Sequence, residues 1–388
     1  MHGTKLEYTL KHNLFLQKLY VFFGSLFFRF LGIFVRPKMN NILFQSMIGR
    51  TFEDSPKVLY EAILRDDFFK NYSFFWAFLD PKKFNIEKGK TIKINSLKYF
   101  ITALKCGVWI GNSGIERGLH FKHKKTIFIN TGHGAAVKYI GNAVKGRKDF
   151  NFSDVDLFCT VSQMDKEVRI RDMNVKEEAL QMIGYPVNDY LYHIDKTEIE
   201  KLKEKYNIPK NKKVICYAPT WRESQDNGKT SVLAPPLNIQ KWRKELSDDY
   251  VIIFRAHHLT TNVLGICFDD FVLDGSSKYP SYEILAISDI LISDYSSILF
   301  DFAILERPLF AFIYDYEQYS KERGLYISPL DFIPETSFMN EDDLLSGIKT
   351  IDVDKQIEVA RQVKEKYMVG NGEATNLCIR FLKDRLLK

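Results

Sequence analysis

Short apolar runs alternate with longer amphipathic runs along most of this chain, and this alternation limits the folds that it can adopt. A short apolar run between polar or glycine-containing loops is typical of a buried strand, and the longer runs have the spacing of helices. Strands that alternate with helices form parallel sheets that are covered by helices on both faces. The sequence therefore predicts an α/β fold.

The candidate strands fall into two series. The first series comprises Ile42–Gln45, Phe74–Leu79, Thr91–Ile94, Val108–Ile110, Ile127–Ile129 and Leu157–Val161. The second series comprises Val214–Tyr217, Tyr250–Phe254, Asp289–Ile292 and Leu309–Ile313. The pattern predicts helices at Pro56–Leu64, Ala135–Val144, Lys196–Tyr206, Tyr282–Ile287, Ile298–Leu305, Asp354–Tyr367 and Glu373–Leu387.

Two series of strands indicate two domains, and a length of 388 residues agrees, because it exceeds what one core usually organises. Gly184-Tyr185-Pro186 ends the first series, so the boundary is placed near residues 187–195. We expect three parts: a segment at residues 1–38, a first domain at residues 39–190 and a second domain at residues 191–388.

The composition is that of a folded globular protein, with 45% hydrophobic and 27% charged residues. The net charge of +6 suits an anionic partner, such as a phosphate-rich ligand or a membrane surface. The sequence contains no RNA-binding motif and no arginine-rich tract, so we expect no nucleic-acid partner. The five cysteines lack metal-ligand spacing, which indicates buried free thiols in a reducing compartment.

Leu14–Val35 is the most apolar part of the chain. Lys18 and Arg29 interrupt it, and no cleavage site of small residues follows, so it is neither a clean membrane span nor a typical signal peptide. Its polar positions share one narrow helical stripe, made of Lys11, Lys18, Ser25, Arg29, Gly32 and Arg36. This pattern favours a helix in the membrane interface, with its cations near anionic headgroups. A true span and a helix packed on the protein's own core are the alternatives.

Ser293–Ala303 (SDYSSILFDFA) joins a candidate strand to a candidate helix. The first N–H groups of a helix have no partner within it, and the helix dipole is positive there, so such a junction favours phosphate. The polar residues of the loop are Ser293, Asp294, Ser296 and Ser297. An ordinary helix cap is the alternative.

Ligands of parallel sheets gather at the carboxyl ends of the strands, and two polar loops lie at such ends in the first domain. One loop, Asn112-Ser113-Gly114, follows the candidate strand Val108–Ile110. The other, residues 130–134 (NTGHG), places His133 between two glycines, where its pKa range suits a general base. A loop histidine that only bonds a neighbour is the alternative. Residues that we place on the acceptor side are Asn112, Ser113, Thr131, Gly132 and Gly134.

Cationic residues follow the strands of the second domain. Arg222 comes soon after Val214–Tyr217 and suits bidentate phosphate binding, with a plain surface arginine as the alternative. Arg255 and His257 follow Tyr250–Phe254 and alternate, so we expect them to point the same way. Asp154 and Asp156 have the D-x-D spacing that some transferases use to bind a metal. They lie at the entry of an apolar strand and not at its carboxyl end, which favours a capping or turn role. We predict no metal and no cofactor.

Taken together, these stretches resemble the CDP-glycerol glycerophosphotransferases of teichoic-acid synthesis. The matching pieces run in order from residue 41 to the C-terminal part of the chain. They are Asn41–Leu64, His133-Gly134, Gly184-Tyr185-Pro186 with Asp189, YAPTWR at 217–222, Arg255 with His257, SDYSSILFDFA at 293–303, Arg323-Gly324 and Gly372-Glu373-Ala374.

The resemblance implies a GT-B-like fold of two facing Rossmann-like domains. It implies transfer of glycerol phosphate from CDP-glycerol to a membrane-bound, polyprenyl-diphosphate-linked acceptor, with release of CMP, at the cytoplasmic face of the membrane. By the resemblance His133 matches the catalytic histidine and His257 a second-domain histidine. Residues around the donor phosphates are Arg255, Ser296, Ser297 and Arg323.

Three alternatives stay open at this point. CDP-ribitol is a second possible donor, and a GT-B glycosyltransferase that uses a nucleotide sugar shares the fold and the diphosphate site. A membrane-docked binding or scaffold protein is a non-catalytic alternative, but it has no need of His133, Arg255 and His257 at strand ends. The acceptor, the number of units transferred and the oligomeric state do not follow from the sequence.

Overall fold

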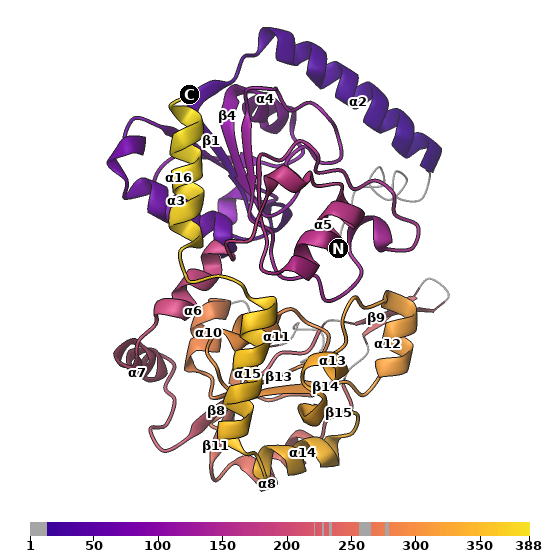
Figure 1. Ribbon diagram of the computed structural model, residues 1–388, viewed down its shortest axis with the longest axis vertical. Coiled ribbons are helices and arrows are strands. Elements are labelled where there is room, and N and C mark those ends of the chain that lie inside the picture. The colour runs from indigo at the N-terminus through magenta and orange to yellow at the C-terminus, as the bar shows by residue number, and fades with distance from the viewer. Residues whose placement is uncertain (1–13, 221, 227–228, 233–234, 256–264, 276–278) are drawn as a thin grey trace.

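The computed structural model describes residues 14–220, 222–226, 229–232, 235–255, 265–275 and 279–388. Figure 1 shows two layered units, each built on a β-sheet with helices around it. In both sheets every neighbouring pair of strands is parallel. The predicted α/β class with parallel sheets is confirmed.

The first sheet has seven strands in the order β3-β2-β1-β4-β5-β6-β7. Their bounds are β1 Lys38–Gln45, β2 Ser73–Phe78, β3 Lys90–Lys93, β4 Cys106–Gly111, β5 Ile127–Asn130, β6 Leu157–Cys159 and β7 Leu180–Gln181. The helices of this part are α2 Leu14–Phe34, α3 Asp54–Leu64, α4 Leu97–Lys105 and α5 Gln163–Met173. Every residue of β4 is buried, as expected for a strand covered on both faces.

The second sheet has six strands in the order β12-β11-β8-β13-β14-β15. Their bounds are β8 Lys213–Tyr217, β11 Tyr250–Phe254, β12 Val272–Asp274, β13 Ile290–Ser293, β14 Leu309–Phe312 and β15 Ser337–Phe338. A separate antiparallel hairpin is formed by β9 Glu223–Asp226 and β10 Lys229–Val232. The helices are α6 Asp189–His193, α7 Lys196–Lys205, α8 Ile239–Leu246, α10 Ser281–Ile287, α11 Ile298–Ala303, α12 Tyr316–Arg323, α13 Pro329–Phe332, α14 Glu341–Lys349, α15 Val353–Tyr367 and α16 Ala374–Leu386.

Both sheets have the strand order of a Rossmann-like, doubly wound fold. The order turns back between β1 and β4 in the first sheet and between β8 and β13 in the second. Ligands of such sheets bind outside the carboxyl ends of the strands at this switch point. The loops after β1, β4, β8 and β13 are therefore the places where a site is expected.

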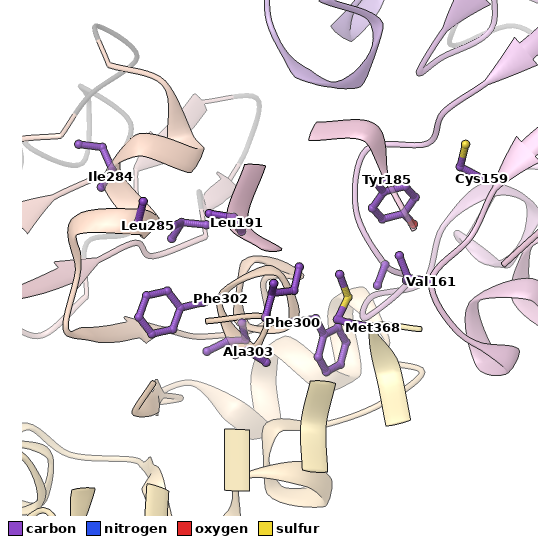
Figure 2. Close-up of a cluster of buried hydrophobic side chains, with 14 of the residues drawn as sticks. Cys159, Val161, Tyr185, Leu191, Ile284, Leu285, Phe300, Phe302, Ala303 and Met368 are labelled. Atoms are coloured by element: carbon purple, nitrogen blue, oxygen red, sulfur yellow. The ribbon is translucent and has the colours of Figure 1, made fainter. Parts of the chain in front are cut away.

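One hydrophobic cluster joins the two units. It runs from Ile42 and Val108 in the first sheet to Leu291 and Leu309 in the second. Figure 2 shows its middle, where Tyr185 and Val161 of the first unit lie near Phe300 and Met368 of the second. Because this junction is apolar and buried, it holds the switch points of the two sheets in one arrangement.

The last helix crosses back to the first unit. Figure 1 shows α16 beside α3, at the opposite end of the molecule from α14. Lys383 pairs with Asp66 at 2.6 Å, and Arg385 pairs with Asp156 at 3.1 Å. The C-terminal part of the expected second domain thus packs on the first. Asp156 also accepts a hydrogen bond from the Phe128 N–H at 2.8 Å, a structural role of the kind that its position predicts.

The helix that we expected at Ala135–Val144 is absent. The structure has an irregular segment there, with one 3-10 turn at Gly141–Ala143. The Tyr139 N–H donates to the Gly324 carbonyl at 3.1 Å, and the Tyr326 N–H donates to the Val137 carbonyl at 2.8 Å. The segment is extended because its backbone pairs with the second unit, a long-range contact that helical periodicity does not reveal.

Helix α2 lies on the outside of the first unit (Figure 1). Two residues of its polar stripe contact the protein: Ser25 Oγ accepts from the His120 N–H at 3.0 Å, and Arg29 Nε donates to the His120 carbonyl at 2.5 Å. Phe28 is buried against Phe100 and Phe121. Ser25 is therefore turned toward the protein, whereas Lys18, Arg29 and Arg36 stay exposed, and the interfacial role of the helix stays a prediction.

The opposite face of α2 is exposed and apolar. It consists of Phe15, Leu16, Leu19, Tyr20, Phe22, Phe23, Leu26, Phe27, Phe30, Ile33 and Phe34. Within the described residues, none of the helices combines the length and apolar character that a membrane crossing requires.

All five cysteines are free thiols, and Cys106, Cys159, Cys216 and Cys378 are buried, as predicted. Cys159 Sγ and Cys378 Sγ lie 3.6 Å apart, which is too far for a disulfide.

Candidate functional site

The His133 loop of the first unit meets the SDYSS loop of the second. The first follows β5 and the second follows β13, so both lie at carboxyl ends of parallel strands. Gly134 has a φ of +129°, and a Cβ atom at this position would collide with Ser297 Oγ. Gly134 is therefore required for this close approach, and the two loops that the sequence singles out are brought together.

The His133 ring is held so that one nitrogen faces outward. Nδ1 lies 2.8 Å from the backbone carbonyl oxygen of Asn112. A carbonyl only accepts hydrogen bonds, so Nδ1 carries the hydrogen, and in the neutral ring Nε2 has the lone pair. The residue is exposed. This geometry suits a general base that takes up a proton on Nε2.

Asn112, whose backbone carbonyl binds His133, is itself held in place by hydrogen bonds of its side chain. Its side-chain oxygen accepts from the Met47 N–H at 2.8 Å, and its Nδ2 donates to Asp54 Oδ2 at 2.9 Å. The side chain is only 2% exposed. Asn112 therefore fixes the loop and does not face a cleft, although it was placed on the acceptor side.

The other residues of the expected acceptor side are also held from within. Ser113 Oγ accepts from Gln45 Nε2 at 3.0 Å and from the Ile48 N–H at 3.3 Å. Thr131 is buried, and its hydroxyl donates to the Gly132 carbonyl at 3.1 Å. Gly132 has a φ of +62° and lies against the ring of Tyr185. These residues shape the His133 loop, and their contact with an acceptor stays a prediction.

Asp54 is a site residue that sequence reasoning missed. It begins α3, which follows the carboxyl end of β1, and its carboxylate reaches Asn112. Burial raises its pKa, while the charge of His133 and hydrogen bonds from Ser55 and Asn112 lower it. The available signal was its place in the sequence, in an Asp-Ser-Pro start of a helix after a candidate strand.

A second carboxylate faces Asp54 from the other unit. Asp301, in α11, accepts a hydrogen bond from Asn188 Nδ2 at 2.8 Å. Burial raises the pKa of Asp301 to about 7; the Asn188 hydrogen bond lowers it, and the charge of Asp54 raises it. The junction of the units thus contains two carboxylates that disfavour each other's charge.

Arg222 is tied into an ion-pair network. Its guanidinium donates to Asp315 through Nε at 2.5 Å and Nη2 at 3.0 Å, and to Asp294 Oδ2 through Nη1 at 2.8 Å. The residue is 6% exposed and lies over the rings of Tyr295, Tyr314 and Tyr319. Its donors point at carboxylates in this structure, so the predicted phosphate contact by Arg222 is not formed here.

Asp294 and Ser293 are used in the same network. Asp294 accepts from the Thr220 N–H at 2.8 Å and from the Thr220 hydroxyl at 2.5 Å, as well as from Arg222. Ser293 Oγ donates to the Ala218 carbonyl at 2.6 Å. Both residues join the ends of β8 and β13, which leaves Ser296 and Ser297 as the partly exposed hydroxyls of the loop.

Arg255 approaches the first unit from the end of β11. It donates to the carbonyls of Gly275 at 2.8 Å and Tyr279 at 3.2 Å and to Ser281 Oγ at 2.8 Å. Burial raises the pKa of Glu53 and the charge of Arg255 lowers it, which places this cation near the first unit. His257 and Trp221 lie outside the described residues.

Arg323 is exposed at the end of α12, where it lines a cavity of about 440 Å³. Lys145 and Tyr139 of the first unit and Lys321 and Tyr326 of the second also line this cavity. Lys138 lies nearby: burial lowers its pKa, the charge of Asp294 raises it, and the charges of Arg323 and Arg222 lower it. Cations of both units therefore gather where the units meet.

Comparisons with known proteins agree with this architecture. A family model described as CDP-Glycerol:Poly(glycerophosphate) glycerophosphotransferase matches residues 27–379. The teichoic acid poly(glycerol phosphate) polymerase of Staphylococcus epidermidis is 33% identical over 369 residues, covering 88% of this chain and 50% of the relative. The teichoic acid glycerol-phosphate transferase of Staphylococcus aureus is 30% identical over 335 residues, covering 81% of this chain and 85% of the relative.

A solved structure of the wall teichoic acid polymerase TagF matches 99% of both chains, with 29% identity and a TM-score of 0.80. A TagF variant soaked with CDPG matches with 29% identity and a TM-score of 0.82, again over 99% of both chains. The chain spans half the length of the Staphylococcus epidermidis relative and most of the Staphylococcus aureus relative.

Proposed function

We propose, from the premise that this chain belongs to the CDP-glycerol:poly(glycerophosphate) glycerophosphotransferase family, that it transfers glycerol phosphate from CDP-glycerol to a hydroxyl group of a lipid-linked acceptor. The observation that carries the proposal is the contact between Gly134, beside an outward-facing histidine, and Ser297. A proton acceptor from one Rossmann-like unit thus stands against the serine loop of the other. The TagF variant soaked with CDPG supports CDP-glycerol as the donor.

The reaction needs positioning and charge stabilisation more than covalent chemistry by the protein. The acceptor oxygen forms a bond to the glycerol-bearing phosphorus, and the bond from that phosphorus to the CMP oxygen breaks with its electron pair. His133 Nε2 takes the proton of the acceptor hydroxyl. CMP leaves from the side of the second unit.

Four residues of the second unit are assigned to the donor phosphates. Ser296 and Ser297 offer hydroxyls at the start of α11, and Arg255 and Arg323 are the cations at the rim of the junction. Arg222 acts indirectly in this proposal, by holding Asp294 and hence the loop in place. His257 is assigned to the leaving phosphate by the resemblance alone.

The exposed apolar face of α2 supports a membrane-bound acceptor. Aromatic side chains such as Phe22, Phe23 and Phe30 are 57–63% exposed and point away from the protein. A helix of this kind binds a membrane interface by inserting its apolar face among the lipids. We assign α2 to docking on the lipid surface, which brings the site to a lipid-linked acceptor.

A donor screen tests the proposal. The protein is incubated with vesicles that contain a polyprenyl-diphosphate-linked acceptor and with CDP-glycerol, CDP-ribitol or UDP-sugars in turn. We expect CMP release from CDP-glycerol and a lipid product that is heavier by one or more glycerol phosphate units. Release from CDP-ribitol or a UDP-sugar alone would replace the proposed donor, and donor binding without turnover would favour a scaffold.

A further inference from the structure

Asp54 lies in a conformation that a helix start does not require. Its φ is +67°, in the left-handed region that a non-glycine residue rarely adopts. Backbone strain of this kind persists where the surroundings hold a residue in place, and it gathers at functional sites. Asp54 accepts the Ser55 N–H at 2.5 Å through Oδ1. This bond runs to the next residue, unlike a capping bond, which goes to the N–H two or three residues on.

The second oxygen of Asp54 has a different partner. Oδ2 accepts from Asn112 Nδ2 at 2.9 Å, although Asn112 follows a different strand, β4. The backbone carbonyl of Asn112 in turn accepts from His133 Nδ1 at 2.8 Å. Asp54 is therefore connected to the catalytic ring through one residue whose side chain is fixed at both ends by hydrogen bonds.

The charges around this connection come from several elements. Glu53 and Lys57 lie at the start of α3, and Arg255 interacts with Glu53 from the second unit. Asp301 faces Asp54 from α11. Arg169 of α5 donates to the Gly134 carbonyl at 2.8 Å and is paired with Asp165 at 3.1 Å, so its charge is largely offset before it reaches His133.

We propose that Asp54 is a positioning residue that holds Asn112 in place and thereby fixes the Nδ1–H form of His133. This inference rests on the proposed function, since it gives His133 the part of the proton acceptor. The carboxylate does not take the proton. It accepts the side-chain N–H of Asn112, and the Asn112 carbonyl in turn keeps the hydrogen of the neutral ring on Nδ1 and the lone pair on Nε2.

Asp54→Asn tests the inference, because it keeps the shape but leaves a single accepting oxygen for the Ser55 N–H and Asn112 Nδ2. Asn112 then loses its partner, and His133 is no longer fixed in one tautomer. The plateau of kcat should fall about tenfold, within the range that general-base help usually supplies. The KM for CDP-glycerol should change little, because Asp54 does not touch the donor loop.

Asp195→Asn is the matched control. Asp195 also serves a helix start, where it accepts the Glu198 N–H at 2.8 Å, but it directly precedes α7 and lies far along the chain from His133. Its kcat should equal that of the wild type. An Asp54→Asn kcat that equals the control value contradicts the inference.

A measurement without turnover separates this inference from the proposed function. The eight histidines are labelled with ¹⁵N, and the His133 signals are identified by their loss in His133→Gln. In the wild type, neutral His133 should carry its hydrogen on Nδ1, and in Asp54→Asn a measurable share of the rings should carry it on Nε2. A hydrogen on Nε2 in the wild type, or the same tautomer in both proteins, overturns the inference even if CDP-glycerol is turned over. Conversely, the expected NMR result stands even if CDP-glycerol is not the donor.

Discussion

The guanidinium group of Arg222 shows how a residue can belong to a site without touching its ligand. Two carboxylates and three tyrosine rings surround it, and Asp315 and Asp294 hold it by charge-assisted hydrogen bonds. From the sequence, an arginine after a strand suggests a phosphate ligand. The two aspartates that occupy it lie more than seventy residues away, so spacing along the chain could not reveal them.

Arg222→Ala is expected to destabilise the second unit, because it leaves the buried Asp294 and the half-buried Asp315 without their cation. Breaking a buried ion pair costs about 3–5 kcal/mol. The midpoint of thermal unfolding should fall by several degrees, whereas Arg243→Ala, a surface pair partner, should leave it nearly unchanged. If Arg222→Ala unfolds like the wild type but no longer binds CDP-glycerol, the direct phosphate contact predicted from the sequence is right.

Asp301 is expected to make the stability of the protein depend on pH. Its folded pKa, about 7, lies above the ordinary value of 3.8, chiefly because it is buried. A raised pKa contributes stability that is fully present below pH 4 and is lost as the pH rises to about 7. Asp301→Asn removes this loss and keeps an acceptor for Asn188.

The unfolding midpoint of Asp301→Asn should therefore rise relative to the wild type between pH 4 and pH 8. The difference corresponds to a free energy of unfolding on the order of 1–3 kcal/mol. Equal midpoint differences at pH 4 and pH 8 would show that Asp301 does not carry a raised pKa.

Among the elements, α11 and the loop before it carry the assignment of the donor side. Replacing both Ser296 and Ser297 by Ala should weaken CDP-glycerol binding by about 10²–10⁴-fold, because hydrogen bonds to a charged group contribute about 1.5–3 kcal/mol each. Calorimetric titration with CDP-glycerol measures this directly. Ser247→Ala with Ser346→Ala, on α8 and α14, is the control. A fall in turnover with unchanged binding would contradict the donor assignment.

Helix α2 is the second element with a testable role. Phe22, Phe23 and Phe30 are exposed on its outer face. Changing all three to Ser should lower binding to vesicles that contain anionic lipids by more than tenfold, because burying one such side chain contributes about 1.5–3 kcal/mol. Vesicle sedimentation measures the effect.

The control for α2 replaces Leu97, Met339 and Leu387 by Ser, three apolar residues that are exposed elsewhere. This variant should sediment with vesicles like the wild type. Equal binding by the α2 variant would assign its apolar face to another partner.

Elements with a local signal were predicted well, and those held by distant contacts were not. Strand β8 and helix α15 begin and end within a residue or so of their predicted bounds, because periodicity and caps are local. The segment at 135–144 was predicted as a helix, yet its backbone pairs with residues 324–326. Similarly, the polar stripe of α2 could be predicted from the sequence, but the hydrogen bonds of Ser25 and Arg29 to the backbone of His120 could not.

The residues of the site were likewise predictable only where the signal is local. His133 and the SDYSS loop could be found because each joins a strand end to polar, glycine-containing sequence. Asp54 and Asp301 could not be paired, since their contact depends on how the two units face each other. The hydrophobic cluster that fixes this arrangement draws on residues from Ile42 to Leu382, and nothing in the local pattern of any one of them indicates it.

At the scale of the whole molecule, two Rossmann-like units present their switch points to each other. The apolar junction, the backbone pairing at residues 137–139 and the crossing of α16 hold them together. The account therefore requires that His133 of the first unit performs chemistry on a donor held by the second.

The most direct test of this claim is to measure turnover and binding of CDP-glycerol by His133→Ala and by the wild type. We predict that turnover falls by about 10²–10⁴-fold, the range of general-base catalysis, while the Kd for CDP-glycerol stays nearly the same. Turnover equal to that of the wild type, or a loss of donor binding as large as the loss of turnover, would contradict the account.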